Sequence, residues 1–174
     1  RDKWERGYRA PRPEDDLSAE VATRLSEKMS EWVALDIVPS EDFPSICNDD
    51  RPIQYGMPRW RDMFSPRQLL GHGTSVEVFR DLLKDAEGRG ALSDVRRAAF
   101  GYLALTLDTM LNYSARACRW DVATLRVRSV FDRHDYAFVS SYAEMACNVD
   151  GLGYDWAVTK TAECIEELVG LARP

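Results

Sequence analysis

Four segments of the chain carry apolar residues at intervals of three and four, and this spacing constrains the fold more than any other feature. Such intervals place the apolar side chains on one face of a helix, whereas a half-buried strand alternates every second residue. The segments are 16–34, 66–86, 93–114 and 154–171. The sequence therefore predicts a mainly α-helical, irregular domain with a long N-terminal helix, a C-terminal helix and long loops.

The segment 66–86 has the clearest start signal of the four. Ser65 is placed to cap the helix, Pro66 takes the first helical position, and Gln68 stands where a capping box needs it. Gly88 and Gly90 follow the segment and favour a helix end there. Because few residues separate it from the next segment, we expect 66–86 and 93–114 to form an antiparallel helical hairpin.

The other segments are less regular. Several prolines make 39–59 a long loop, and its apolar side chains indicate a loop packed against a core: Phe43, Ile46, Ile53, Tyr55 and Met57. The stretch 125–131 alternates in part, so the chain has at most one or two short strands. We expect an extended basic arm over 1–13, with Trp4 and Tyr8 as possible anchors, and a single helical domain over 14–174.

Composition limits the classes of function. The net charge of −6 over 174 residues argues against nonspecific coating of nucleic acid by the whole surface. No apolar run approaches the roughly 20 residues of a membrane helix, so we expect no membrane partner. No two of the four cysteines are spaced as C-x-x-C, which favours buried free thiols in a cytoplasmic protein. A start at Arg1, within a charged segment, favours an excised fragment of a larger protein.

Catalytic signatures are absent from the sequence. It has no G-x-G-x-x-G, P-loop, H-E-x-x-H or G-x-S-x-G motif, so we expect no catalytic residue, cofactor or metal in this chain. His72 lies on the apolar face of its helix, where a hydrogen-bonded core histidine is favoured over a general base. His134, flanked by Asp132 and Asp135, fits a functional cluster and a charged turn equally well.

The region 116–134 is the best candidate for a partner surface, because arginine forks match phosphates and aromatic rings stack on bases. The candidate nucleic-acid-binding residues are Arg116, Arg119, Trp120, Arg126, Arg128, Arg133 and His134. The alternative is that these arginines pair with acidic residues of the first and last helices. A contiguous exposed patch favours DNA contact, and burial against carboxylates favours a structural role.

Three strings in the chain resemble a known family. They are IQYGMPRWRDMFSPRQLL (53–70), LNYSARACRW (111–120) and VFDRHDYAF (130–138). They are similar to the central region of the large bacterial and archaeal adenine-specific DNA methylases, which carry an N-terminal domain of unknown function and, in many members, an embedded zinc ribbon. The resemblance runs from about Trp4 to the C-terminus.

In that family, this region lies between the half that binds S-adenosylmethionine and the D-P-P-Y catalytic loop. The chain has no F-x-G-x-G loop, no D-P-P-Y or N-P-P-Y tetrad, and no zinc-ribbon cysteine pairs. The resemblance therefore implies a place within a methyltransferase that uses S-adenosylmethionine, and not a catalytic role for these residues.

The resemblance implies an accessory domain that assists DNA binding or target recognition beside the catalytic core. Methylation of adenine requires the base to leave the duplex, so additional grip on DNA is useful. The expected partners are DNA, through the parent protein, and the remaining domains of the same polypeptide. The alternatives are a structural scaffold, or a protein-interaction module that docks through the acidic first helix.

Overall fold

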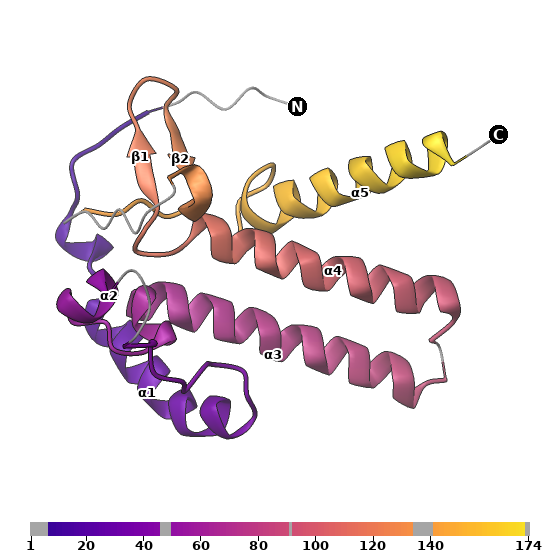
Figure 1. The fold of residues 1–174 in the computed structure, drawn as a ribbon, viewed down its shortest axis with the longest axis horizontal. Helices are drawn as coiled ribbons and strands as arrows, with labels where there is room; N and C mark the ends of the chain where they lie inside the picture. The colour runs from indigo at the N-terminus through magenta and orange to yellow at the C-terminus, as the bar shows by residue number, and fades with distance from the viewer. Residues whose placement is uncertain (1–6, 46–49, 91, 134–140, 173–174) are drawn as a thin grey trace.

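The computed structural model describes residues 7–45, 50–90, 92–133 and 141–172, and it confirms the predicted mainly helical fold (Figure 1). None of the described helices is long and apolar enough to cross a lipid bilayer. The helices are α1 (Ser18–Ala34), α2 (Arg51–Gln54), α3 (Pro66–Gly88), α4 (Asp94–Tyr113) and α5 (Gly153–Leu171). The strands are β1 (Arg119–Asp121) and β2 (Arg126–Arg128), and short 3-10 turns lie at Pro13–Asp15, Trp60–Met63 and Val130–Asp132.

Helices α3 and α4 form the predicted antiparallel hairpin, which runs through the middle of the molecule (Figure 1). Both helices begin at a serine cap, and the one at Ser65 is the cap that the sequence predicts. The Ser65 hydroxyl accepts from the backbone N–H of Gln68, and the Gln68 side chain accepts from the backbone N–H of Ser65. The Ser93 hydroxyl accepts from the backbone N–H of Arg96. These local bonds satisfy donors that a helix start leaves without an intrahelical partner.

Helix α1 packs on α3 at the main hydrophobic core. Trp32 is fully buried there, together with Val38 and Leu69. The close approach depends on Gly73 of α3, because the Trp32 ring occupies the space that a Cβ at this position would need. Helix α1 ends at Ala34, where the predicted segment 16–34 ends, and it begins at Ser18.

Backbone contacts join the two ends of the loop 39–59. Asp42 and Arg59 form an antiparallel bridge, and the backbone N–H of Phe43 donates to the Pro58 carbonyl at 2.6 Å. Phe43 and Met57 are buried, as a packed loop predicts. Tyr55 differs, since 64% of it is exposed. Ile46 lies outside the described residues.

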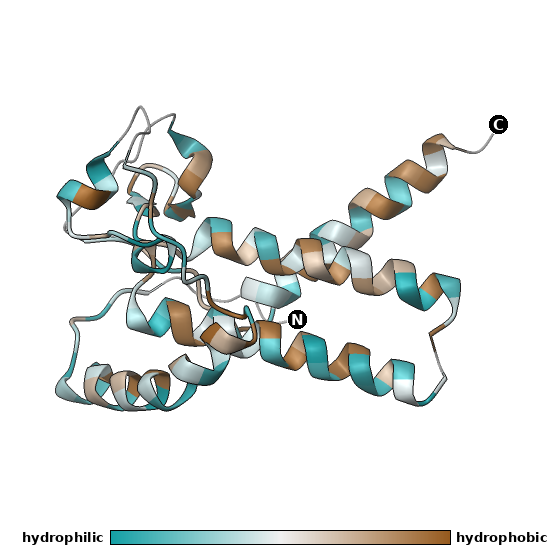
Figure 2. Ribbon diagram, turned by 60° about the horizontal axis from the view of Figure 1, so that its bottom comes forward, coloured by the Kyte–Doolittle hydropathy of each residue, from teal (hydrophilic) through white to brown (hydrophobic). Residues whose placement is uncertain are grey.

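Helix α5 rests on α4 through its first half. Ala157 is buried, and the Trp156 ring meets Tyr113 of α4 edge-on, with 5.4 Å between ring centroids. The apolar spacing of 154–171 leads one to expect Leu168 and Val169 to point inward, and this expectation is wrong, because they are 59% and 48% exposed. Helix α5 leaves α4 at an angle, so no described element covers its last turns (Figure 2).

Candidate nucleic-acid interface

The arginine-rich region folds into a small antiparallel hairpin after α4. Arg119 of β1 stands opposite Arg128 of β2, and Asp121 stands opposite Arg126. Leu125, in the connecting turn, takes the left-handed conformation with φ 50°. The partial alternation over 125–131 predicts β2, whereas β1 lies outside that alternating stretch, and the sequence does not indicate it.

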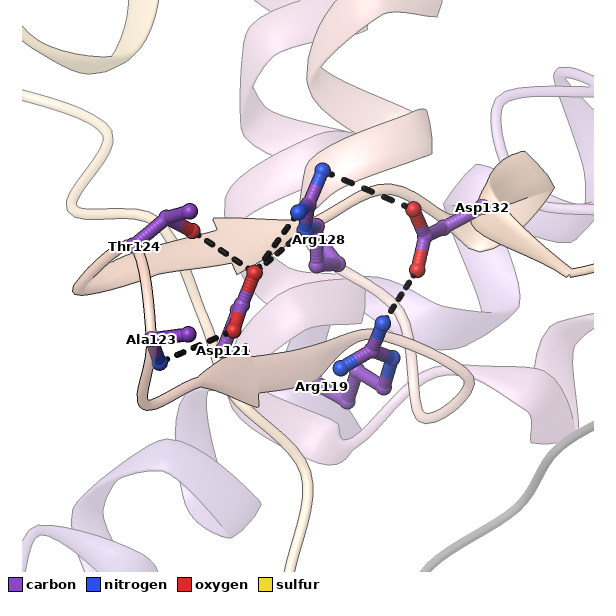
Figure 3. A network of polar contacts seen from close by, with 6 residues as sticks. All are labelled: Arg119, Asp121, Ala123, Thr124, Arg128 and Asp132. Carbon is purple, nitrogen blue, oxygen red and sulfur yellow. Dashed lines mark hydrogen bonds and ion pairs between the residues drawn. The ribbon is translucent and has the colours of Figure 1, made fainter.

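Two of the arginines are held by carboxylates of the hairpin and of the 3-10 turn that follows it (Figure 3). Arg128 lies 2.7 Å from the Asp121 carboxylate, and Arg119 lies 2.6 Å from that of Asp132. Arg128 also approaches Asp132 at 3.7 Å. The guanidinium groups are half-buried by these contacts. The alternative that these arginines pair with acidic residues is therefore observed for Arg119 and Arg128. Their partners lie within 116–134 and not in the first and last helices.

Asp121 is the centre of this network. Its carboxylate accepts from the Thr124 hydroxyl at 2.7 Å, from Arg128 at 2.8 Å, and from the backbone N–H of Ala123 at 3.0 Å (Figure 3). These hydrogen bonds, Thr124 first and then Arg128, hold the pKa of Asp121 well below its usual range. The carboxylate is charged at neutral pH and offsets the charge of Arg128.

The other predicted residues lie apart from this network. Arg126 and Arg133 are exposed, and neither has an ion pair with a described residue. Trp120 is 43% exposed and meets Tyr8 of the N-terminal arm edge-on, with 6.4 Å between ring centroids. Arg116 is half-buried, and His134 lies outside the described residues. The candidates therefore do not share one role. Arg119 and Arg128 hold the hairpin together, whereas Trp120, Arg126 and Arg133 are exposed.

His72 has the structural environment of a core histidine. Its Nε2 lies 2.9 Å from the carbonyl of Ser114, the residue that follows α4, and its ring meets Phe64 edge-on. A carbonyl oxygen only accepts, so Nε2 carries the proton. Burial lowers the pKa of His72, against the opposing effects of the Ser114 hydrogen bond and the negative charge of Glu144. The ring therefore joins α3 to the end of α4.

A second feature has no counterpart in the sequence prediction. The segment 141–147 returns to the start of α3, where Glu144 lies 2.6 Å from Arg67 and accepts from the Ser65 hydroxyl at 3.1 Å. A cleft of about 700 Å³ opens between this segment, α3 and the end of α4. Its lining includes Gln68, His72, Ser114, Tyr142, Glu144 and Met145. Within the described ranges, no three His, Cys, Asp or Glu side chains are grouped so that they could hold a metal ion.

Comparison with known proteins assigns no family: no protein-family model, curated protein or solved structure matches the chain. The methylase resemblance stays a prediction. In space, the first two strings and the described part of the third, 130–133, meet at one end of the α3–α4 hairpin. The backbone N–H of Arg116 donates to the Met63 carbonyl at 2.9 Å, which joins the first string to the second. The pair of Arg119 and Asp132 joins the second to the third.

Proposed function

We propose that this chain is an accessory helical domain of an adenine-specific DNA methyltransferase-like protein of the prokaryotic cytoplasm, and that it assists DNA binding beside the catalytic core. The contacts between the described parts of the three strings support this proposal, because the residues that carry the resemblance then form one continuous part of the fold. Catalysis and S-adenosylmethionine belong to the parent protein. The partners of this chain are DNA and the remaining domains of the same polypeptide.

The observation that carries DNA contact is the sorting of the arginines. Arg119 and Arg128 are neutralised by Asp121 and Asp132, so they shape the hairpin. Arg126 is exposed on β2 without an ion pair among the described residues, and Arg133 is exposed just after the Val130–Asp132 turn. Free guanidinium groups on a rigid hairpin are suited to contact backbone phosphates, which positions a protein on a duplex without reading its sequence.

The test is duplex binding of the intact protein by fluorescence anisotropy over a range of salt concentrations. Arg126→Ala and Arg133→Ala should each weaken binding and reduce the slope of log affinity against log salt by about 0.9, the value for one lost phosphate contact. Arg24→Ala is the matched control, because this exposed arginine pairs with Glu20 on α1, away from the hairpin. If the hairpin variants keep the affinity and slope of the Arg24 variant, this face does not contact DNA.

A structural scaffold is the second candidate, and the exposed apolar residues of α5 favour it. Leu168, Val169 and Leu171 are 59%, 48% and 83% exposed. Such residues on one projecting helix suit a contact with protein. Helix α1 is the weaker docking candidate, since its large exposed apolar residues, Leu17 and Leu35, flank its two ends.

The scaffold role makes a separate prediction. Leu168→Ser with Val169→Ser should lower the melting temperature of the parent protein, where another domain covers α5, and leave that of the isolated chain nearly unchanged. The reason is that surface substitutions without a partner stay within about 0.5 kcal/mol. Equal melting temperatures of the parent protein with and without the two changes rule this contact out.

A further inference from the structure

The tip of the β1–β2 hairpin exposes apolar side chains. Four residues, 122–125, connect the two strands, and all four are exposed. Val122 and Leu125, the first and last of them, are 75% and 40% exposed. They lie across from each other at the base of the loop, because the neighbouring Asp121 and Arg126 are partners in the strand register. The tip projects away from α3 and α4 (Figure 1), so an approaching partner can reach both side chains.

The tip is held in one conformation by Asp121. This carboxylate accepts from the backbone N–H of Ala123 at 3.0 Å and from the Thr124 hydroxyl at 2.7 Å, and both residues belong to the loop (Figure 3). It also lies 2.7 Å from Arg128 of β2, so the loop is anchored to both strands. The apolar side chains on either side of Ala123 and Thr124 are therefore presented at fixed positions.

Leu125 is an unusual residue for its place in the loop. Its φ of 50° lies in the left-handed region, where a Cβ is strained and glycine or asparagine is the common choice. Its side chain is also apolar and partly in solvent. Asparagine would close the same loop without either cost. A strained residue that its surroundings hold in place is typical of a functional site, so the tip is expected to do more than connect two strands.

The charge beside the tip indicates the kind of partner. Arg126 follows Leu125 directly, is exposed, and has no ion pair with a described residue. The apolar tip therefore borders a free guanidinium group. Duplex DNA offers the matching pair of surfaces, since its phosphates lie outside and its stacked bases are apolar. Proteins that kink DNA insert apolar side chains between base steps and place basic residues beside them. An apolar pocket in a protein would match the tip but not Arg126.

We infer that the tip enters a base step of duplex DNA, where Val122 and Leu125 replace part of the stacking contact and Arg126 binds an adjoining phosphate. The inference rests on the proposed DNA contact and adds to it a preference for DNA whose stacking is weakened. Separating two stacked base pairs costs free energy, and this cost is lower where a base is missing or unpaired. A contact with phosphates alone carries no such preference.

The experiment compares two duplexes of the same length and sequence, one fully paired and one with a single abasic site at its centre. Binding of the intact protein to each is followed by fluorescence anisotropy at several salt concentrations. The abasic duplex should bind at least about threefold more tightly, because the gap in its stack already admits the tip. The two salt slopes should be equal, since the same phosphates are contacted.

Two variants of the tip separate insertion from folding. Leu125→Asn removes the apolar side chain and suits the left-handed conformation, so thermal unfolding should show no loss of stability in the isolated chain. With this change, or with Val122→Ser, the ratio of the two affinities should fall toward one. The salt slope should not change, because Arg126 is retained. Val95→Ser is the matched control, since Val95 is 80% exposed at the opposite end of α4 from the β-hairpin, and it should keep the full ratio.

The outcomes distinguish this inference from the proposed DNA contact. Equal binding of the two duplexes by the unmodified protein, or an unchanged ratio in both tip variants, overturns insertion. The DNA contact stands in that case as long as Arg126→Ala and Arg133→Ala still weaken binding and reduce the salt slope. If the tip variants instead lower the melting temperature of the intact protein and leave the ratio unchanged, the tip occupies a pocket in another domain, which also overturns the inference.

Discussion

Substitution of Gly73 by alanine tests the packing of α1 on α3. A Cβ at this position would lie 2.3 Å from Trp32 Cζ3, 2.5 Å from Cε3 and 2.7 Å from Cη2. Ordinary carbon contacts are about 3.5–4.0 Å, so the ring would have to move by roughly an ångström. Trp32 is fully buried in the cluster with Val38 and Leu69, and a rigid ring in that position has little room to move.

The magnitude has two opposing parts. Forcing an additional carbon into a packed core typically costs about 1–3 kcal/mol, and the rigid ring places this case near the upper end. Replacement of glycine by alanine inside a helix returns up to about 1 kcal/mol. Gly73→Ala should therefore lower the free energy of unfolding by about 2 kcal/mol, which corresponds to a decrease of about 4–8 °C in melting temperature.

Gly101→Ala is the matched control, because Gly101 lies in α4 with no atom within 4 Å of the position of a Cβ. It receives the same helical benefit without the clash, so it should be equal to or more stable than the unmodified chain. Urea unfolding of both variants isolates the contact as the difference between them. If Gly73→Ala is as stable as Gly101→Ala to within about 0.5 kcal/mol, the described approach of Trp32 to α3 is wrong.

Three further predictions follow from the contacts described. The pKa of His72 is near 6.5 in the unfolded chain and lower in the folded chain, so the unfolded chain binds more protons between the two values, and the free energy of unfolding should decrease as pH falls below about 6.5. Urea unfolding at several pH values measures this dependence, which His72→Gln should reduce and the control His134→Gln should leave with its His72 part intact. Ser65→Ala removes the cap of α3 and should cost about 0.5–2 kcal/mol, measured by thermal unfolding. Asp121→Asn removes the charge that holds Arg128 and should accelerate hydrogen exchange of the β2 amides that bond to β1, whereas Asp108→Asn, an exposed change on α4, should not.

The helical hairpin could be predicted because its signals are local. Ser65, Gln68 and Ser93 fix the helix starts through bonds that span three residues, and these bonds depend little on the rest of the fold. The last turns of α5 show the limit of the same reasoning. A helical period indicates that Leu168 shares a face with other apolar residues, but not that another element covers that face.

For the candidate site, the sequence predicts which residue types are present but not how they are arranged. The richness in arginine is visible in the sequence, whereas the pairing of Arg119 with Asp132 depends on how a hairpin with three-residue strands folds back. The cleft has no local signal, because Glu144 meets Ser65 and Arg67 across 79 and 77 positions of sequence. Such contacts exist only after the helices have packed.

The burial along the α3–α4 hairpin is unequal. His72 and Met110 are buried toward one end, whereas none of the described residues between 81 and 99 is buried. The far end therefore has few tertiary contacts to lose when it opens. Local unfolding should begin at the turn between the two helices and spread inward, so native-state hydrogen exchange should slow in steps from there toward Met110. The end that holds the cleft and the arginine hairpin would then be the last part of the helical hairpin to open.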